Sequence, residues 1–180
     1  YTPVTGIWQT VWLESVPQTY IVSTKQTPRL DDGVLAFQAS VEGSQAGDEI
    51  KVRALDGGKV IKEQTGQPNT SFDLSVPNLE PWSPSNPKLY DLEIQLIRKG
   101  KVVDQAKSYF AMRKIAMQKD ENGVQRLMLN NKFTFQYGPL DQGWWPDGLH
   151  TAPTDEALKF DVVKTCLLYT SPSPRDGLLS

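Results

Sequence analysis

Residues 19–113 contain a series of short segments in which apolar and polar side chains alternate, separated by turn-forming residues. In 34–42, for example, Leu35, Phe37 and Val41 fall on one side of an extended chain. Such alternation predicts a strand with one buried face. About seven strands of this kind fit into roughly 95 residues, which is typical of an antiparallel β-sandwich of immunoglobulin-like size.

Turn signals support this interpretation. Asp56-Gly57-Gly58 and Lys99-Gly100 separate alternating segments, and glycine accepts the positive φ that tight hairpins require. Residues 77–87 hold four prolines and cannot run inside a sheet, because proline has no N–H to donate. We expect a surface crossing there. The Cys…Trp…Cys pattern of antibody domains is missing, so only the architecture is predicted.

Composition excludes several classes of protein. The chain has 19 Lys and Arg against 21 Asp and Glu, a net charge of -2, and therefore lacks the basic surplus that binds nucleic acid non-specifically. No segment approaches the roughly 20 apolar residues of a membrane span. No signal peptide is visible, but this excludes nothing, because the true N-terminus is expected to lie outside this sequence. One cysteine and one histidine exclude an internal disulfide and a Cys- or His-rich metal site. We expect no metal and no cofactor.

Residues 7–14 read as a strand that is apolar on both faces. Ile7 and Val11 fall on one face, and Trp8 and Trp12 on the other. A strand of this kind needs cover on both sides, so its partners are expected in polypeptide outside this sequence. The two tryptophans fit a seam between domains better than a platform for sugar.

The pattern changes after residue 113. Segments 124–129 and 133–137 flank Asn130-Asn131 and predict a second hairpin. Thr154 can cap a helix that starts at Asp155, and Leu158 and Val162 are expected to face inward. A strand, a dense loop and a helix in this order are expected for the opening unit of an α/β barrel or an α/β sheet, left incomplete in this sequence.

Residues 166–180 differ in sequence pattern from the rest of the chain. Residues 166–176, CLLYTSPSPRD, are interrupted by two prolines and are not expected to continue the helix. The string resembles the translation of a transposon-based sequencing adapter. We therefore treat 166–180 as an adapter-derived tail, with a natural disordered C-terminus as the alternative, and assign Cys166 no chemistry.

Four segments together resemble one enzyme family. They are TGIWQTVWLE at 5–14, WSPSNPKLYDL at 82–92, YFAMRKI at 109–115 and LDQGWWPDG at 140–148. Their order and spacing resemble glycoside hydrolase family 2, and most closely its β-galactosidase-like members. The resemblance implies a domain order: residues 1–15 end a sugar-binding jelly roll, 16–113 form the immunoglobulin-like sandwich, and 114–165 begin the (α/β)8 catalytic barrel. Contacts to both missing neighbours are expected.

The resemblance also implies a retaining glycosidase mechanism. One glutamate protonates the leaving oxygen and a second attacks the anomeric carbon, with the two carboxyls about 5–5.5 Å apart. Both belong to later barrel strands, so no residue of this chain inherits a catalytic role. We expect the parent protein to hydrolyse terminal β-galactosides or related β-glycosides in carbohydrate metabolism, and the fragment to be inactive. A non-catalytic carbohydrate-binding or structural β-sandwich module is the alternative.

The loop before the helix holds the candidate substrate-binding residues. By the resemblance it comes after the first barrel strand, at the rim where active sites form. Asp141, Gln142, Trp144 and Trp145 could line the substrate entrance, the tryptophans by stacking on sugar and the polar pair by binding hydroxyls. The alternative is that both tryptophans pack against neighbouring domains while the acids bond loop amides.

The sequence does not distinguish between the bacterial cytoplasm and the periplasm as the location of the protein.

Overall fold

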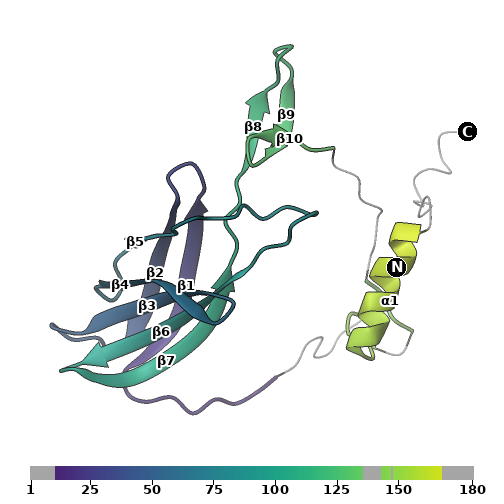
Figure 1. Cartoon of the computed structure of the whole chain (residues 1–180). Helices are drawn as coiled ribbons and strands as arrows, with labels where there is room; N and C mark the ends of the chain where they lie inside the picture. Colours follow the sequence, from purple (N-terminus) through teal and green to yellow (C-terminus); the bar gives the residue numbers. More distant parts are fainter. Residues whose placement is uncertain (1–10, 136–142, 147, 168–180) are drawn as a thin grey trace, which may run out of the picture. The chain divides into compact units, whose positions relative to one another are not determined.

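The computed structural model describes residues 11–135, 143–146 and 148–167 (Figure 1). The chain divides into two compact units. One is Ser15–Phe135, and the other contains the helix and the loop before it.

The first unit contains the predicted sandwich. Its strands form two antiparallel sheets, in the orders β1-β2-β5 and β4-β3-β6-β7 (Figure 1). This confirms the mainly β fold expected from the alternation between residues 19 and 113. The strands are β1 (Tyr20–Arg29), β2 (Val34–Glu42), β3 (Glu49–Asp56), β4 (Lys59–Gly66), β5 (Phe72–Ser75), β6 (Tyr90–Arg98) and β7 (Lys101–Phe110).

Alternate residues of the central strands fill the core between the two sheets. Phe37 of β2, Val52 of β3 and Leu96 of β6 are all fully buried, which is the period-2 pattern read from the sequence. The Tyr90 ring stacks on Phe110 with 5.2 Å between ring centroids. Burial of this apolar surface is the main force that holds the two sheets together.

Both glycine turns reverse the chain as predicted. Gly57 and Gly58 have φ of 55° and 82° between β3 and β4, and Lys99 and Gly100 have φ of 50° and 74° between β6 and β7. Positive φ at both central residues gives the turn the twist that antiparallel strands need. The proline-rich crossing lies outside the strands, apart from one isolated bridge between Ser83 and Asn86.

A smaller antiparallel sheet comes after the sandwich in the chain, in the order β10-β9-β8. Its strands are β8 (Ile115–Lys119), β9 (Gln125–Leu129) and β10 (Lys132–Phe133). The hairpin predicted around Asn130-Asn131 is confirmed, with φ of 53° and 65° at the two asparagines. The second strand is much shorter than the predicted 133–137, because only Lys132 and Phe133 find backbone partners on β9. Residues 136 and 137 lie outside the described residues.

The second unit contains α1 (Asp155–Leu167). The predicted cap is confirmed, because the backbone N–H of Ala157 donates to Thr154 Oγ1 at 3.1 Å. Leu158 and Val162 do not face inward: they are 50% and 64% exposed, because no described residue covers them. The helix includes Cys166 and Leu167, contrary to the predicted break at 166, since no proline or glycine interrupts the chain between α1 and Pro172.

The strand predicted over 7–14 is not present in residues 11–14, which carry no regular secondary structure. Trp12 is 75% exposed there. A strand forms only where its backbone pairs with another strand, and no described residue pairs with this segment. Residues 7–10 lie outside the described residues. No helix in the described part of the chain is long and apolar enough to span a membrane.

Candidate functional site

The predicted substrate-binding loop is held by backbone hydrogen bonds in its described part. Trp145 and Leu149 exchange both N–H···O bonds, at 2.7 and 3.1 Å. Leu149 adopts φ of 56°. Only glycine fits at position 148, because a Cβ there would clash with the backbone oxygen of Thr151. This tight loop fixes the backbone that carries Trp144 and Trp145.

Trp144 presents part of its indole ring to solvent. Its side chain is 51% exposed, and the ring meets His150 edge-on, with 5.4 Å between centroids. Trp145 is half-buried. No sequence pattern predicted the contact of Trp144 with His150, although both lie on the same short loop. Asp141 and Gln142, the two polar candidates, lie outside the described residues, as does Asp147.

The acids that open α1 have a structural role. Asp155 and Glu156 occupy its first turn and Lys164 its last turn, which matches the charge preference of the helix dipole. Among the described residues, no group of three or more His, Cys, Asp or Glu side chains could hold a metal ion.

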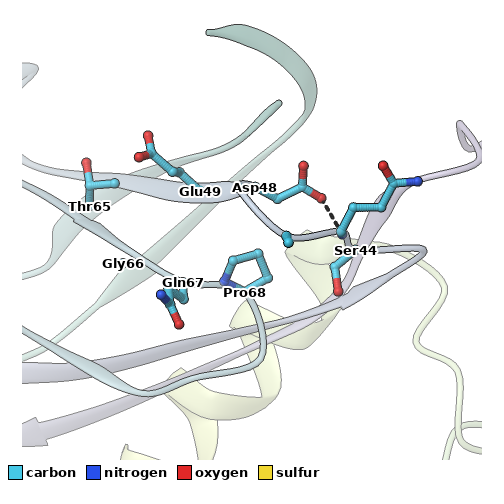
Figure 2. Close-up of a pocket in the computed structure, with 10 residues that line it drawn as sticks. Ser44, Asp48, Glu49, Thr65, Gly66, Gln67 and Pro68 are labelled. Carbon is cyan, nitrogen blue, oxygen red and sulfur yellow. Dashed lines mark hydrogen bonds between the residues drawn. The ribbon is translucent and has the colours of Figure 1, made fainter. Parts of the chain in front are cut away.

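A pocket of about 580 Å³ lies at one end of the sandwich (Figure 2). It is lined by the loop from β2 to β3, including Ser44 and Asp48, and by the end of β4 and the loop after it, including Thr65 and Pro68. The lining is mixed polar and apolar. Asp48 is a buried acid of this pocket, so its protonation state bears on whether the pocket can do acid–base chemistry.

Asp48 forms an ion pair with Arg98 from the end of β6. Arg98 Nε donates to Asp48 Oδ1 at 2.8 Å, and Arg98 Nη2 donates to Oδ2 at 2.7 Å. The backbone N–H of Gln45 also donates to Oδ2, at 2.8 Å. Arg98 further donates to the carbonyl oxygen of Gly43 at 3.0 Å. Both carboxylate oxygens are therefore occupied by donors from the protein itself.

These contacts keep Asp48 ionised. Hydrogen bonds from Arg98 lower the pKa of Asp48 from 3.8 to about 2, against the opposing effect of burial, and the Gln45 N–H lowers it further. A proton donor at neutral pH needs a raised pKa instead. Asp48 is thus a structural anion that joins the β2–β3 loop to the end of β6, and it does not supply the pocket with a catalytic acid.

The pKa of Asp48 predicts a pH dependence of stability. Because the folded-state pKa lies below the unfolded one, ionised Asp48 stabilises the fold above about pH 4, and this contribution is lost as pH falls toward 2. We expect Asp48→Asn to lower the free energy of unfolding by about 2 kcal/mol at pH 7. The deficit should shrink between pH 4 and 2. Urea titrations at several pH values measure this difference in the free energy of unfolding.

Asp91→Asn serves as the control, because Asp91 is exposed on β6. The free energy of unfolding of this variant should equal that of the parent chain at every pH. A deficit of Asp48→Asn that stays constant from pH 7 to pH 2 would contradict the assignment of Asp48 as a stabilising anion.

A polar junction, which no sequence pattern predicted, fastens the small sheet to the sandwich. Asn130 Nδ2 donates to the Trp82 carbonyl at 2.8 Å, and its Oδ1 accepts from the Lys114 N–H at 3.0 Å. Asn131 Nδ2 donates to Asp31 at 2.8 Å, and Lys114 Nζ pairs with the same carboxylate. The asparagine pair signalled a turn in the sequence, but not these long-range partners. We call these five residues the junction.

Comparison with known proteins shows the family of this chain. The model of glycosyl hydrolases family 2 matches residues 19–113, which are the sandwich. The chain belongs to this family. Two proteins of Formosa agariphila that bear the name "Putative beta-glucuronidase" are 31% and 27% identical over 129 and 117 residues. These alignments cover 66% and 60% of this chain.

Solved structures show the same fold. The crystal structure of Ruminococcus gnavus β-glucuronidase matches with a TM-score of 0.70 at 18% identity, over 83% of this chain. The same enzyme in complex with D-glucuronic acid matches with a TM-score of 0.65. The chain spans 12% and 14% of the length of the two curated relatives and 24% of the first solved chain.

Proposed function

We propose that this chain supplies the sandwich of a retaining β-glycosidase whose substrates are β-glucuronides. The family match over residues 19–113 carries the glycosidase part of the proposal. The narrower substrate class is supported by the names of the curated relatives. The resemblance in the sequence favoured β-galactosides, and these are the competing substrate class.

The domain assignment is part of the same proposal. We assign 1–15 to the end of a sugar-binding domain, 16–113 to the sandwich and 114–165 to the start of the catalytic barrel. Full burial of the core between the two sheets supports 16–113 as a scaffold. The scaffold orients its neighbours and leaves the chemistry to two carboxyl groups elsewhere in the polypeptide, about 5–5.5 Å apart for a retaining reaction.

The test is a comparison of substrates with the protein from the whole reading frame. We expect a higher kcat/KM for 4-nitrophenyl β-D-glucuronide than for the β-D-galactoside or β-D-mannoside. The 180-residue chain alone should show no turnover above the blank. Preference for the galactoside would overturn the substrate class. Heat-labile turnover by the 180-residue chain would overturn the assignment of the chemistry to other parts of the polypeptide.

A second prediction concerns the tryptophan loop. We propose that Trp144 and Trp145, with Asp141 and Gln142, line the substrate entrance of the whole enzyme. The half-exposed ring of Trp144 supports this, because an accessible aromatic face can stack on a sugar. Trp144→Ala should raise KM roughly fivefold, which corresponds to about 1 kcal/mol of lost contact, with little change in kcat.

Two variants test whether the change in KM is specific. Trp144→Phe retains an aromatic face and should restore most of the affinity. Trp12→Ala removes another exposed indole, 75% accessible, from a segment that we assign to a domain seam, and should leave KM unchanged. If Trp144→Ala lowers thermal stability but not affinity, then Trp144 is a packing residue.

A further inference from the structure

The pocket at the end of the sandwich has no role in the proposed function (Figure 2). Its volume of about 580 Å³ lies within the range of roughly 300–1,000 Å³ that is usual for small-molecule sites. The loop from β2 to β3 places it beyond Glu42, the last residue of β2. The junction residue Asp31 precedes the first residue of the same strand, Val34. The pocket and the junction therefore lie at opposite ends of β2.

Both walls of this pocket are held by side chains that bond backbone groups. In the loop from β2 to β3, Asp48 accepts the Gln45 N–H at 2.8 Å and is paired with Arg98. In the loop after β4, Asn69 Oδ1 accepts the backbone N–H of Val41 on β2 at 2.8 Å. Ligand sites are usually preformed in this way, because a site that is already ordered loses less conformational entropy when it binds.

Asn69 also joins the two walls to each other. Its Nδ2 donates to Ser44 Oγ at 3.2 Å, and its backbone N–H donates to the Ala39 carbonyl at 2.9 Å. Asn69 has φ of 61°, a conformation that asparagine adopts more readily than most residues. The separation of the walls is therefore set by hydrogen bonds of the fold and does not require a ligand.

The charges of the lining disfavour an acidic ligand. Both oxygens of Asp48 are occupied by Arg98, so this carboxylate is not available to a ligand. The exposed carboxylate of Glu49 is the other charged group among the described residues of the lining. It can accept hydrogen bonds from hydroxyl groups, and it repels an anion.

The rest of the lining offers hydroxyl and amide groups together with apolar surface. Ser44 and Thr65 carry hydroxyls, Gln45 and Gln67 carry amides, and Pro68 adds an apolar ring. Hydroxyls and amides can both donate and accept hydrogen bonds, which suits a ligand that is dense in hydroxyl groups. A sugar ring has such a periphery, and its apolar C–H faces can pack against a proline ring.

We propose that this pocket binds a neutral sugar residue. Membership of a family of glycosyl hydrolases supports a carbohydrate as the ligand. The pocket holds the sugar without cleaving it, because its buried acid, Asp48, is committed to Arg98. The inference goes beyond the proposed function and does not depend on it, since the proposed substrates carry a carboxylate and this ligand does not.

Amide chemical shifts of the isotope-labelled 180-residue chain test the proposal. Cellobiose and lactose are the neutral probes, and D-glucuronate is the acidic control. At least one neutral disaccharide should cause saturable shifts in residues 44–49 and 65–67, and D-glucuronate should cause none. The absence of saturable shifts with both neutral probes, shifts confined to residues outside the pocket, or equal shifts with D-glucuronate would overturn the proposal.

Three variants test whether the sugar binds in the pocket. Gln67→Ala removes one amide and should raise Kd roughly fivefold, the loss of about one hydrogen bond. Gln105→Ala, at an exposed position of β7, should leave Kd unchanged. Ala46→Trp adds a large side chain to the lining and should abolish binding without lowering the melting temperature, because Ala46 is exposed. Binding that survives Ala46→Trp, or equal changes for the two glutamine variants, would overturn the proposal.

Discussion

Replacing Phe37 by alanine is expected to lower the free energy of unfolding by about 3–5 kcal/mol. Phe37 is fully buried in the centre of β2, and its ring packs at 5.6 Å from that of Phe72 on β5. The substitution removes a large apolar surface from the core and leaves a cavity that the two sheets cannot close. Since domains are stable by only about 5–15 kcal/mol, much of the stability would be lost. Urea denaturation followed by circular dichroism measures this loss of unfolding free energy.

Phe135→Ala is the matched control. The same side chain is removed there, but Phe135 is 74% exposed and lies beyond the last strand of the unit. We expect a change within about 0.5 kcal/mol. A loss at Phe37 no larger than the loss at Phe135 would mean that the core does not lie between the two sheets.

Gly66→Ala should have the second-largest effect, a loss of about 1–3 kcal/mol. A Cβ at Gly66 would lie 2.1 Å from Cδ1 and 2.4 Å from Cε1 of Phe72, because the ring covers this end of β4. The Phe72 ring also packs on the Phe37 ring, with 5.6 Å between centroids, so turning it away disrupts that contact. The variant must displace the Phe72 ring or move β4. Thermal unfolding measures the loss.

A double-mutant cycle separates this clash from a general effect at Gly66. In a Phe72→Ala background the ring is absent, so Gly66→Ala should cost almost nothing there. We expect a coupling of at least about 1 kcal/mol between the two positions. If the cost of Gly66→Ala is the same in both backgrounds, the close approach of Phe72 is not its cause.

Much of the fold could be predicted because strands with one buried face leave a local signature. The alternation in 34–42 predicted a strand that the structure places over the same range, and the Gly57-Gly58 and Lys99-Gly100 turns reversed the chain where expected. The cap at Thr154 is similarly local. The strand predictions for residues 11–14 and for the end of the second hairpin were wrong, because a strand forms only where its backbone pairs with another segment. The local sequence does not show whether such a segment is present.

The candidate site could be predicted less well. The indole of Trp144 could be recognised as suited to sugar from its residue type alone, but its packing on His150 depends on the loop geometry. The residues next to Asp48 in the sequence do not indicate that its pKa is lowered. Its low pKa results from Arg98, which lies 50 residues away in the chain.

The sequence by itself determined the antiparallel strands, their turns and the start of the helix, because hydrophobic period, positive-φ glycines and capping side chains act over a few residues. Only the tertiary structure decided which polar groups meet: Asp48 with Arg98, Asn130 with Trp82, and Asp31 with Lys114. These outcomes depend on contacts between distant segments, and such contacts exist only after the sheets have packed.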